Sequence, residues 1–349
     1  MTNPPAPPAA GPAPGPAPGE ALDPALLRPF WYPVLPLPLL QERPVAVELL
    51  GEPLVLWRDG TGRVHAAPDR CPHRSARLSG GSLTPDGHLA CPYHGWSFDG
   101  DGHCRSIPQQ PDRPIPATCR LPLLPARESC GYVWVCLDAE PRLPPPLFPE
   151  EHDPGHRLIP GFWETWRCSP FRLIENGLDN YHHFFVHRGL LEATTPVPDP
   201  IEGELEELPD GFRFSIPLEV HNNTVLTSTL GSAPSTLTVQ RTVRWIAPLG
   251  LSLELAWPNG LRQRIVLYAV PRNDHETQVS RFYFRNDREE EVPAESMVHF
   301  ERGLIDQDRA ILTAMAGGLQ PWPPGEHLIE ADRPIARMRA RLRELLQPV

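Results

Sequence analysis

Residues 29–137 carry their hydrophobic positions in short runs that turn residues separate. Residues 44–48, 54–57 and 63–67 read as strands, and Asp59-Gly60-Thr61-Gly62 between the last two has the composition of a hairpin turn. Residues 131–135 form one apolar run, which is typical of a buried strand. The pattern therefore predicts a small all-β domain in the N-terminal part of the chain.

Beyond residue 158 the runs become longer. Five alternating or β-branched segments separated by Asn, Asp and Gly predict a twisted antiparallel sheet, namely residues 212–216, 236–246, 251–255, 262–270 and 278–284. Apolar residues recur every three or four positions in 295–315 and 333–346, which predicts helices, and 176–186 is the best helix candidate in the middle of the chain. We therefore expect an α+β protein.

Composition divides the chain into three parts. Residues 1–19 are almost wholly Pro, Ala and Gly, and such a segment buries too little apolar surface to offset its ordering entropy, so we expect residues 1–28 to form a disordered tail. The proline-dense run 141–149 has the composition of a linker. We therefore expect one domain over residues 29–145 and a second over 146–349.

Charge and cysteine usage narrow the classes of function. The chain has 32 Lys and Arg against 43 Asp and Glu, and its net charge of −11 argues against nucleic acid or an anionic membrane as partner. No run approaches 18 apolar residues and the N-terminus lacks a secretory pattern, so we expect neither a membrane span nor export. Of the seven cysteines, Cys71 and Cys91 lie in the two Cys-His segments considered next, and the remaining five are an odd number without regular spacing. This favours a reducing compartment and predicts a cytoplasmic protein.

Two segments, Cys71-Pro-His73-Arg74 and Cys91-Pro-Tyr93-His94-Gly-Trp96, each offer one thiolate and one imidazole. Two cysteines and two histidines in this arrangement suit a [2Fe-2S] cluster in which thiolates hold one iron and imidazoles the other. A structural zinc site is the alternative, since the same four groups supply tetrahedral ligands. Zinc sites usually keep their two histidines together, so the spacing favours the cluster.

A second group of metal-ligating residues lies between Asn176 and His187. Two imidazoles and a carboxylate, bound on one face, leave open positions on Fe(II) and mark non-haem iron oxygenases. His187 follows His182 by five residues, about 140° round an ideal helix, so we expect the helix to end or distort between them. His183 is an alternative ligand, and an amphipathic helix with incidental histidines is the structural alternative.

The carboxylate ligand is expected from the C-terminal helical region. Asp306 and Asp308 both stand there, in the stretch Leu304-Ile-Asp306-Gln-Asp308-Arg, and a solvated charged face is the alternative to either. Asp332 lies in a separate Asp-Arg-Pro segment and is expected to be structural.

Together these motifs resemble the Rieske non-haem iron oxygenases, specifically their terminal oxygenase (alpha) component. The resemblance rests on CPHR…CPYHGW from Cys71, on D-x2-H-x4-H from Asp179, and on Gln307-Asp308-Arg309. The paired extra cysteines of the respiratory Rieske type are missing. Ser169-Pro-Phe-Arg and Asp332-Arg-Pro are similar to a bacterial, largely cyanobacterial, branch that includes saxitoxin-type alkaloid hydroxylases.

The resemblance implies a fold and a set of site residues. It implies an all-β Rieske [2Fe-2S] domain followed by a helix-grip (START/Bet v1-like) catalytic domain, whose antiparallel sheet curls around a long helix. The implied cluster ligands are Cys71, His73, Cys91 and His94, with Arg74, Tyr93 and Trp96 around them; the implied iron ligands are His182, His187 and Asp308. Asn176 and Asp179 are the implied catalytic residues. Asp179 would join His182 to His94 of the next subunit, which implies a homotrimer.

The resemblance also implies a reaction. A terminal oxygenase takes electrons from NAD(P)H, through a reductase or a ferredoxin, and uses O₂ to hydroxylate or oxidatively demethylate a small aromatic or alkaloid-like substrate. An electron-transfer protein without oxygenase chemistry is the alternative, but it leaves residues 176–187 unexplained; a zinc-stabilised binding module is a third possibility. Monooxygenation and dioxygenation both remain open, as does the substrate. Arg241, Arg244 and Trp245 could meet an anion or an aromatic ring, although alternating strand residues usually face solvent and core.

Overall fold

The computed structural model describes residues 21–190, 192–193, 205–221, 236–315 and 317–347. In its N-terminal part, ten short strands form three antiparallel sheets, ordered β1-β10-β9, β2-β3-β4 and β5-β6-β7-β8. The strands are β1 (Trp31–Pro36), β2 (Val45–Leu49), β3 (Glu52–Arg58), β4 (Val64–Pro68), β5 (Ser82–Leu83), β6 (Leu89–Ala90), β7 (Ser97–Phe98), β8 (Cys104–Ser106), β9 (Ala126–Ser129) and β10 (Tyr132–Cys136). The predicted all-β domain is confirmed, with strand ends displaced by one or two residues.

The expected N-terminal tail was too long at its C-terminal end. Residues 1–20 lie outside the described part of the chain, but residues 21–28 are built into the fold. The 3₁₀ helix η1 (Pro24–Leu27) begins where the Asp23 carboxylate accepts a hydrogen bond from the Ala25 amide, and Leu22 and Leu27 are buried. These two leucines join the main core, so the ordered fold begins before residue 29.

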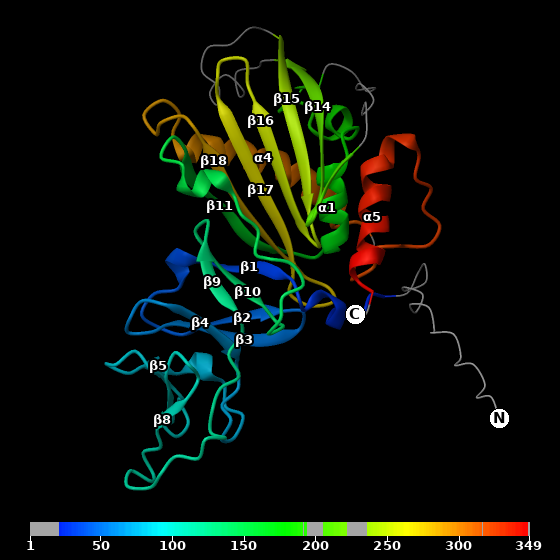
Figure 1. Ribbon diagram of the computed structural model, residues 1–349. Helices are drawn as coiled ribbons and strands as arrows, with labels where there is room; N and C mark the ends of the chain where they lie inside the picture. Colours follow the sequence, from blue (N-terminus) through cyan, green and yellow to red (C-terminus); the bar gives the residue numbers. More distant parts are fainter. Residues whose placement is uncertain (1–20, 191, 194–204, 222–235, 316, 348–349) are drawn as a thin grey trace, which may run out of the picture.

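One large antiparallel sheet dominates the C-terminal part (Figure 1). Its order is β11-β18-β17-β16-β15-β14-β12, and β13 pairs with β14. The strands are β11 (Arg157–Trp166), β12 (Glu192–Ala193), β13 (Glu206–Leu208), β14 (Gly211–His221), β15 (Thr236–Ile246), β16 (Gly250–Ala256), β17 (Arg262–Pro271) and β18 (Thr277–Arg285). All five predicted strand segments lie within these elements. β11 was missed because Pro160 and Gly161 interrupt its pattern, and the register shifts between Pro160 and Trp163.

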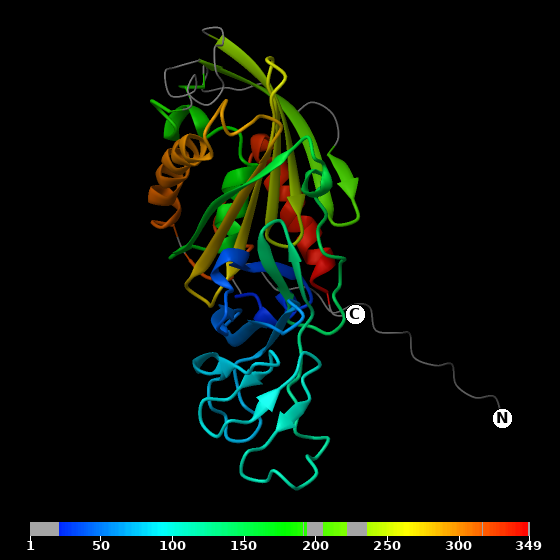
Figure 2. The same ribbon diagram turned by 90° about the vertical axis from the view of Figure 1, so that its left-hand side faces the viewer.

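Three longer helices accompany the sheet: α1 (Pro170–Leu178), α4 (Ala294–Leu312) and α5 (Arg333–Leu345). α1 packs against β15, β16 and β17, while α4 packs against β11 and α1, and α5 lies beside α1 (Figures 1 and 2). The short elements are α2 (His183–Val186), η2 (Leu37–Leu39), η3 (Leu78–Gly80), η4 (Pro149–His152) and η5 (Glu330–Asp332). Both predicted C-terminal helices, and the α+β architecture as a whole, are confirmed.

The helix predicted over residues 176–186 was wrong. The structure has α1 further upstream, and the helix stops at Leu178, because Asp179 adopts an extended conformation with ψ 134°. Backbone helix resumes only in the single turn of α2, which ends before His187. The expected end of the helix between His182 and His187 is therefore confirmed, and a further break that the sequence analysis did not expect precedes His182.

The two parts share one continuous hydrophobic core, because β1 and β10 pack against β17 and β18. Trp134 meets Tyr268 edge-on, with ring centroids 4.9 Å apart, and the Ser280 hydroxyl donates to the Pro33 carbonyl at 3.0 Å. A second, smaller core around Trp57, Leu89 and Phe98 supports β5 to β8. Figure 2 shows this lobe at the end of the molecule remote from the large sheet.

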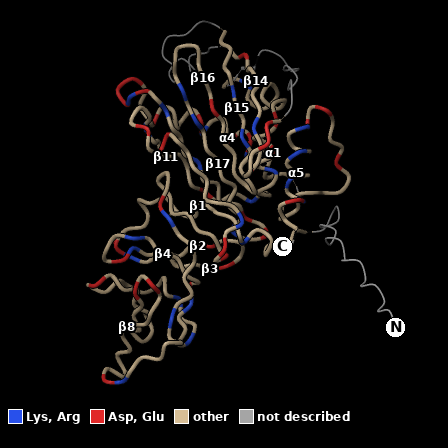
Figure 3. The backbone as a smooth tube through the Cα atoms, in the orientation of Figure 1, with Lys and Arg blue, Asp and Glu red and all other residues tan. Residues whose placement is uncertain are grey.

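The proline-dense run 141–149 follows β10 and ends at Pro149, the first residue of η4, and a boundary between residues 145 and 146 stays a prediction. Acidic and basic residues are interleaved along both parts of the chain (Figure 3). Within the described residues, no helix is both long and apolar enough to cross a membrane.

Candidate metal centres and the adjoining pocket

The two Cys-His segments form equivalent loops, one between β4 and β5 and the other between β6 and β7. In each loop the cysteine N–H donates to the carbonyl five residues later, at 2.8 Å for both Cys71 and Cys91. The amide four residues later donates back to the cysteine carbonyl, at 2.9 Å and 3.0 Å respectively. That fourth residue has a positive φ in both loops, 59° at Ser75 and 74° at Gly95. The same backbone trace therefore presents one thiol and one imidazole twice.

The side chains of the two loops converge. Cys71 and Cys91 are both buried and their side chains interact, and the ring centroids of His73 and His94 lie 4.6 Å apart. Burial, with a contribution from neighbouring Cys91, raises the pKa of the Cys71 thiol to about 11. Two adjacent buried thiolates therefore need a compensating cation, and the donor set fits a metal centre.

The spacing of these four donors bears on the choice between a cluster and zinc. A tetrahedral zinc ion holds its ligand atoms at about 2.0 to 2.3 Å, which brings them all close together. Among the described residues, Cys71, His73, Cys91 and His94 do not form a group whose donor atoms all lie within 4.8 Å of one another, whereas His182, His183 and His187 do. The wider separation suits ligands divided between two irons.

Aromatic residues pack around the loops. The Trp96 ring stacks on His73, with centroids 4.5 Å apart and planes at 3°. The ring centroids of Tyr93 and His94 lie 3.8 Å apart, and Tyr93 is 55% exposed. The Arg74 guanidinium stands over the Tyr93 ring. Trp96 is thus placed to fix the His73 ring, while Tyr93 and Arg74 form a surface next to His94.

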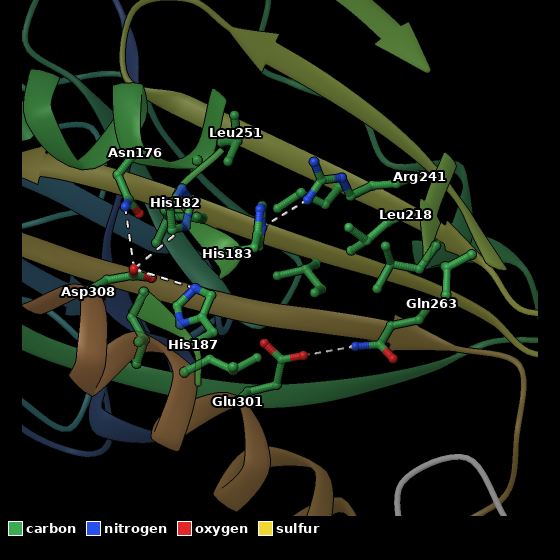
Figure 4. A pocket seen from close by; sticks show the side chains of 18 of the residues that line it. Asn176, His182, His183, His187, Leu218, Arg241, Leu251, Gln263, Glu301 and Asp308 are labelled. Carbon is green, nitrogen blue, oxygen red and sulfur yellow. Dashed lines mark hydrogen bonds and ion pairs between the residues drawn. The ribbon is translucent and has the colours of Figure 1, made fainter. Parts of the chain in front are cut away.

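The second site gathers where α1 ends. The turn after Leu178 directs His182 toward α4, and one turn of α2 later His187 approaches α4 as well. His182 Nε2 lies 3.7 Å from Asp308 Oδ1, and His187 Nε2 lies 3.5 Å from the same oxygen (Figure 4). The Asn176 amide donates to that oxygen at 3.3 Å. Two imidazoles and one carboxylate therefore point at a common position, the donor set that suits non-haem Fe(II).

Each histidine is oriented through its other ring nitrogen. His182 Nδ1 donates to Asp179 Oδ2 at 3.1 Å, and His187 Nδ1 donates to Gln307 Oε1 at 3.1 Å. Burial raises the pKa of Asp179, but its hydrogen bonds to His182 and to nearby amides outweigh this and lower the pKa overall. Asp179 thus stays a carboxylate, and the two bonds leave each Nε2 lone pair free for a metal.

His183 is close to this position but is already engaged. Its Nδ1 donates to the Asn180 carbonyl at 2.9 Å, so its Nε2 accepts from the Arg241 guanidinium at 3.0 Å. Desolvation lowers the pKa of His183 well below its usual range, which keeps the ring neutral. Although the three histidine side chains lie within 4.8 Å of one another, His183 has no free nitrogen for an ion.

The remaining candidates lie apart from this position. Asp306 is exposed on α4, whereas Asp308 is only 6% exposed, because α4 turns Glu301, Ile305, Asp308 and Leu312 toward the sheet. Asp332 accepts a hydrogen bond from the Ile329 amide at the start of η5, as its expected structural role requires.

A cavity of about 130 Å³ adjoins the histidines, between the sheet and α4 (Figure 4). Its walls are largely apolar and include Leu218, Val239, Leu253, Leu255, Trp257, Ile265, Phe300 and Leu304. At one side, Glu301 forms a buried ion pair with Arg281 and accepts a hydrogen bond from Gln263 at 3.3 Å. An apolar pocket with a few fixed polar groups is the usual form of a small-molecule site.

Several of these residues were missed by the sequence analysis. Gln307 is part of the motif Gln307-Asp308-Arg309, but the sequence analysis gave it no role. Its amide, next to a candidate ligand, was the signal that could have identified it. Glu301, Gln263 and Arg281 carried no signal, because a single inward-facing polar residue on a helix or strand resembles any solvated one. Of the three residues named for the sheet, only Arg241 lines the pocket: Arg244 pairs with Asp210, and Trp245 packs in the core.

Comparisons with known proteins agree with this geometry. The family model of the Rieske [2Fe-2S] domain matches residues 30–124, and that of the vanillate O-demethylase oxygenase C-terminal domain matches residues 166–347. Methylxanthine N1-demethylase NdmA of Pseudomonas putida is 35% identical over 197 residues, which is 54% of this chain and 55% of that protein. Methylxanthine N3-demethylase NdmB of the same organism is 28% identical over 318 residues, 86% of this chain and 83% of its own length.

Solved structures extend the similarity. The structure of Pseudomonas putida NdmA with caffeine superposes with a TM-score of 0.79 at 26% identity and covers 92% of both chains. The oxygenase component of dicamba O-demethylase from Stenotrophomonas maltophilia is 35% identical over 169 residues, 48% of each chain. The chain therefore belongs to the Rieske oxygenases, oxidoreductases that use O₂, with a catalytic part of the vanillate O-demethylase oxygenase C-terminal family.

Proposed function

We propose that the chain is a terminal oxygenase that binds a [2Fe-2S] cluster through Cys71, His73, Cys91 and His94. A single ferrous ion would be held by His182, His187 and Asp308. The observation that carries this proposal is the convergence of two histidines and one carboxylate on a common position beside an apolar cavity. The electron-carrier alternative offers no account of that convergence.

The bound cofactors would supply one-electron transfer and O₂ activation, and this chain's residues would prepare the site for both. Asp179 and Gln307 hold the Nδ1 protons of His182 and His187, so each ring keeps the tautomer that a metal needs. Asn176 donates to Asp308 and restrains its carboxylate. The apolar walls limit water around the reacting group.

The proposed reaction is oxidative demethylation of a small aromatic or heteroaromatic compound. Support comes from the names of the relatives, which are N1- and N3-demethylases of methylxanthines and an O-demethylase of dicamba. In such a reaction R–X–CH₃, O₂, NAD(P)H and a proton give R–XH, formaldehyde, NAD(P)⁺ and water, where X is N or O. A reductase or a ferredoxin would bring the electrons from NAD(P)H. Ring or C–H hydroxylation would use the same residues and differs only in the position presented.

A homotrimer is part of the proposal. The lobe that carries the Cys-His loops lies away from α1 and α4, which carry Asn176 and Asp308 of the second site (Figures 1 and 2). An electron from that lobe therefore has a long way to travel to the site of its own chain. Asp179 is 26% exposed, and His94 is partly exposed. We propose that Asp179 of one subunit meets His94 of the next.

Seven cysteines without a disulfide support a reducing, cytoplasmic location.

Metal analysis of the anaerobically reconstituted protein tests the proposal. An oxygenase holds three irons and two labile sulfides per chain, whereas a carrier holds two irons and a zinc module is colourless. Sedimentation of the same sample tests the trimer, and a purely monomeric protein would contradict it. A panel of N- and O-methylated aromatics with a surrogate reductase, followed by formaldehyde release and product mass, then tests demethylation. Gain of one oxygen without formaldehyde would indicate hydroxylation instead.

A further inference from the structure

Cys104 and Cys119 are two free thiols in the lobe that carries the Cys-His loops, and neither is among the expected cluster ligands. Both pack in the small core around Trp57, Leu89 and Phe98. Cys104 is buried at the start of β8, whereas Cys119 is half-buried in a stretch whose neighbouring residues are exposed. One thiol of the pair is therefore shielded, and the other can be reached from solvent.

The backbone places these two cysteines opposite each other. His103 and Arg120 form an antiparallel bridge, and in the next pair the Cys104 amide donates to the carbonyl of Cys119 at 3.1 Å. Directly opposed residues of antiparallel chains point to the same face with Cα atoms about 4.5 to 5.5 Å apart, within the range of about 4.4 to 6.8 Å that a disulfide spans. Burial and the neighbouring Cys119 thiol raise the pKa of Cys104, against a hydrogen bond to Ser106, so the two thiols interact.

The segment between the two cysteines, residues 105–118, lies against the second Cys-His loop. The Gln109 side chain donates to the His94 carbonyl at 2.8 Å. At the next residue, Gly95, a Cβ would lie 3.2 Å from Cγ of Pro108, so the proline packs directly on the backbone of the loop. A bond between the two cysteines would therefore close, at its base, a segment that contacts the backbone of an expected cluster ligand.

We propose that hydrogen peroxide oxidises Cys104 and Cys119 to a reversible disulfide, and that this bond fastens residues 105–118 over the second Cys-His loop. The accessible Cys119 thiol attacks peroxide: a sulfur–oxygen bond forms, the oxygen–oxygen bond breaks and one water leaves. The Cys104 thiol then attacks the resulting sulfenic acid and displaces a second water. Two thiols and one peroxide thus give one disulfide and two waters, with two electrons passing from sulfur to oxygen. In a reducing compartment other thiols reverse the bond.

Peptide mapping of the holoprotein tests the bond. One equivalent of hydrogen peroxide is added, free thiols are alkylated, and trypsin and chymotrypsin digest the protein together. Each of the two cysteines then lies on a peptide of its own, 99–105 and 106–120, and neither peptide contains an expected cluster ligand. We expect these two peptides to be joined, with their summed mass less two hydrogens, and to be separated by dithiothreitol. Absence of the joined pair, or joining of either peptide to one that carries a cluster ligand instead, would overturn the proposal.

Three variants test the roles of the two thiols. C104S lacks the second thiol, so Cys119 should stop at the sulfenic acid and be trapped by dimedone, whereas C119S should give no trapped Cys104 at the same dose. C136S is the control, because Cys136 is another buried thiol of the N-terminal part, on β10, where it donates to the Arg28 carbonyl. It should form the joined peptides as the unchanged protein does. Trapping of Cys104 rather than Cys119 would refute the proposed order of attack.

Retention of the cluster tests the fastening of the segment. The visible absorbance of the cluster is followed in excess chelator after peroxide treatment of the unchanged protein and of C119S. Both suffer the same direct damage by peroxide, but only the unchanged protein can form the bond. We expect its cluster to be lost at least about tenfold more slowly, because a bond that closes a loop restricts the opened chain. Dithiothreitol should abolish the difference, and equal rates of loss before its addition would refute the fastening.

Discussion

Gln307 and His187 are joined by a hydrogen bond of 3.1 Å from the imidazole Nδ1 to the amide Oε1, across 120 residues of sequence. The next residue of α4, Asp308, places its Oδ1 3.5 Å from the other nitrogen of the same ring. Two consecutive residues of α4 thus face the two ring nitrogens of His187. The Gln307 amide is itself set by a bond from its Nε2 to the Arg188 carbonyl at 3.4 Å, which turns its oxygen toward His187.

Removing the Asp308 carboxylate should empty the proposed iron site alone. D308A is expected to retain two irons per chain and the visible spectrum of the cluster, and to lose formaldehyde production, because two imidazoles without a carboxylate bind Fe(II) weakly. D306A is the matched control, since Asp306 is an exposed carboxylate on the same helix. Iron analysis would contradict the assignment if D308A kept three irons or D306A lost one.

The Gln307 amide should matter through His187. Q307L removes the acceptor of the Nδ1 proton, and loss of such a partner typically costs a site about 10- to 100-fold in metal affinity or activity. Q307E keeps an acceptor and should recover most of the iron affinity. Competition with a chelator measures both variants, and equal affinities for Q307L and the unchanged protein would show that the contact has no orienting role.

The Asp179 carboxylate should couple the two metal centres. D179N keeps the shape of the side chain and should leave three irons and the assembly size unchanged, but it should slow single-turnover product formation by at least about tenfold, since it removes the charge that orients His182. Rapid reduction of the cluster followed by quench measures this rate. An unchanged rate would exclude Asp179 from the path between the centres.

Two turn glycines in the N-terminal part allow the stability cost of backbone strain to be measured apart from the cost of a steric clash. Gly62 and Gly102 have similar left-handed φ values of 86° and 80°, but a Cβ on Gly62 would meet nothing within 4 Å, whereas one on Gly102 would lie 2.5 Å from the Leu121 carbonyl oxygen. G62A should cost about 1 kcal/mol of unfolding free energy from strain alone. G102A should cost roughly 1 to 3 kcal/mol more, because the backbone must move. Denaturant titration measures the difference, and equal losses would contradict the predicted clash.

Acid should weaken the hairpin that Asp59 stabilises. Burial opposes ionisation of Asp59, but hydrogen bonds from Thr61, His65 and the Arg63 amide prevail and hold its pKa well below its usual range. A lowered folded-state pKa contributes stability above the unfolded value, about 3.9, that is lost as pH falls through the folded value. The stability difference between the unchanged protein and D59N should therefore be constant above about pH 5 and shrink below about pH 4. D112N, at an exposed position, should show no such pH dependence.

Local sequence patterns determined much of this protein. Alternation over a few residues located the strands around the Cys-His loops and in the large sheet, because successive side chains of a strand point to opposite faces and leave that pattern in the local sequence. The spacing within Cys71-x-His73 and Cys91-x2-His94 indicated the donor chemistry, because the two ligands of each loop are near neighbours along the chain. The Asp179 to His187 segment indicated a second metal centre, although the helix that carries it ends earlier than a periodic pattern suggests.

The tertiary structure alone decided which polar residues face one another. Asp306 and Asp308 are chemically alike, and only the packing of α4 against the sheet turns Asp308 inward. Arg241 and Arg244 share a strand, yet its register points one into the cavity and the other toward Asp210. Such choices depend on contacts between residues far apart along the chain, by 132 positions for Asn176 and Asp308, 58 for His183 and Arg241 and 34 for Asp210 and Arg244. A local pattern carries no record of them, because burial is a property of the assembled sheet and helices.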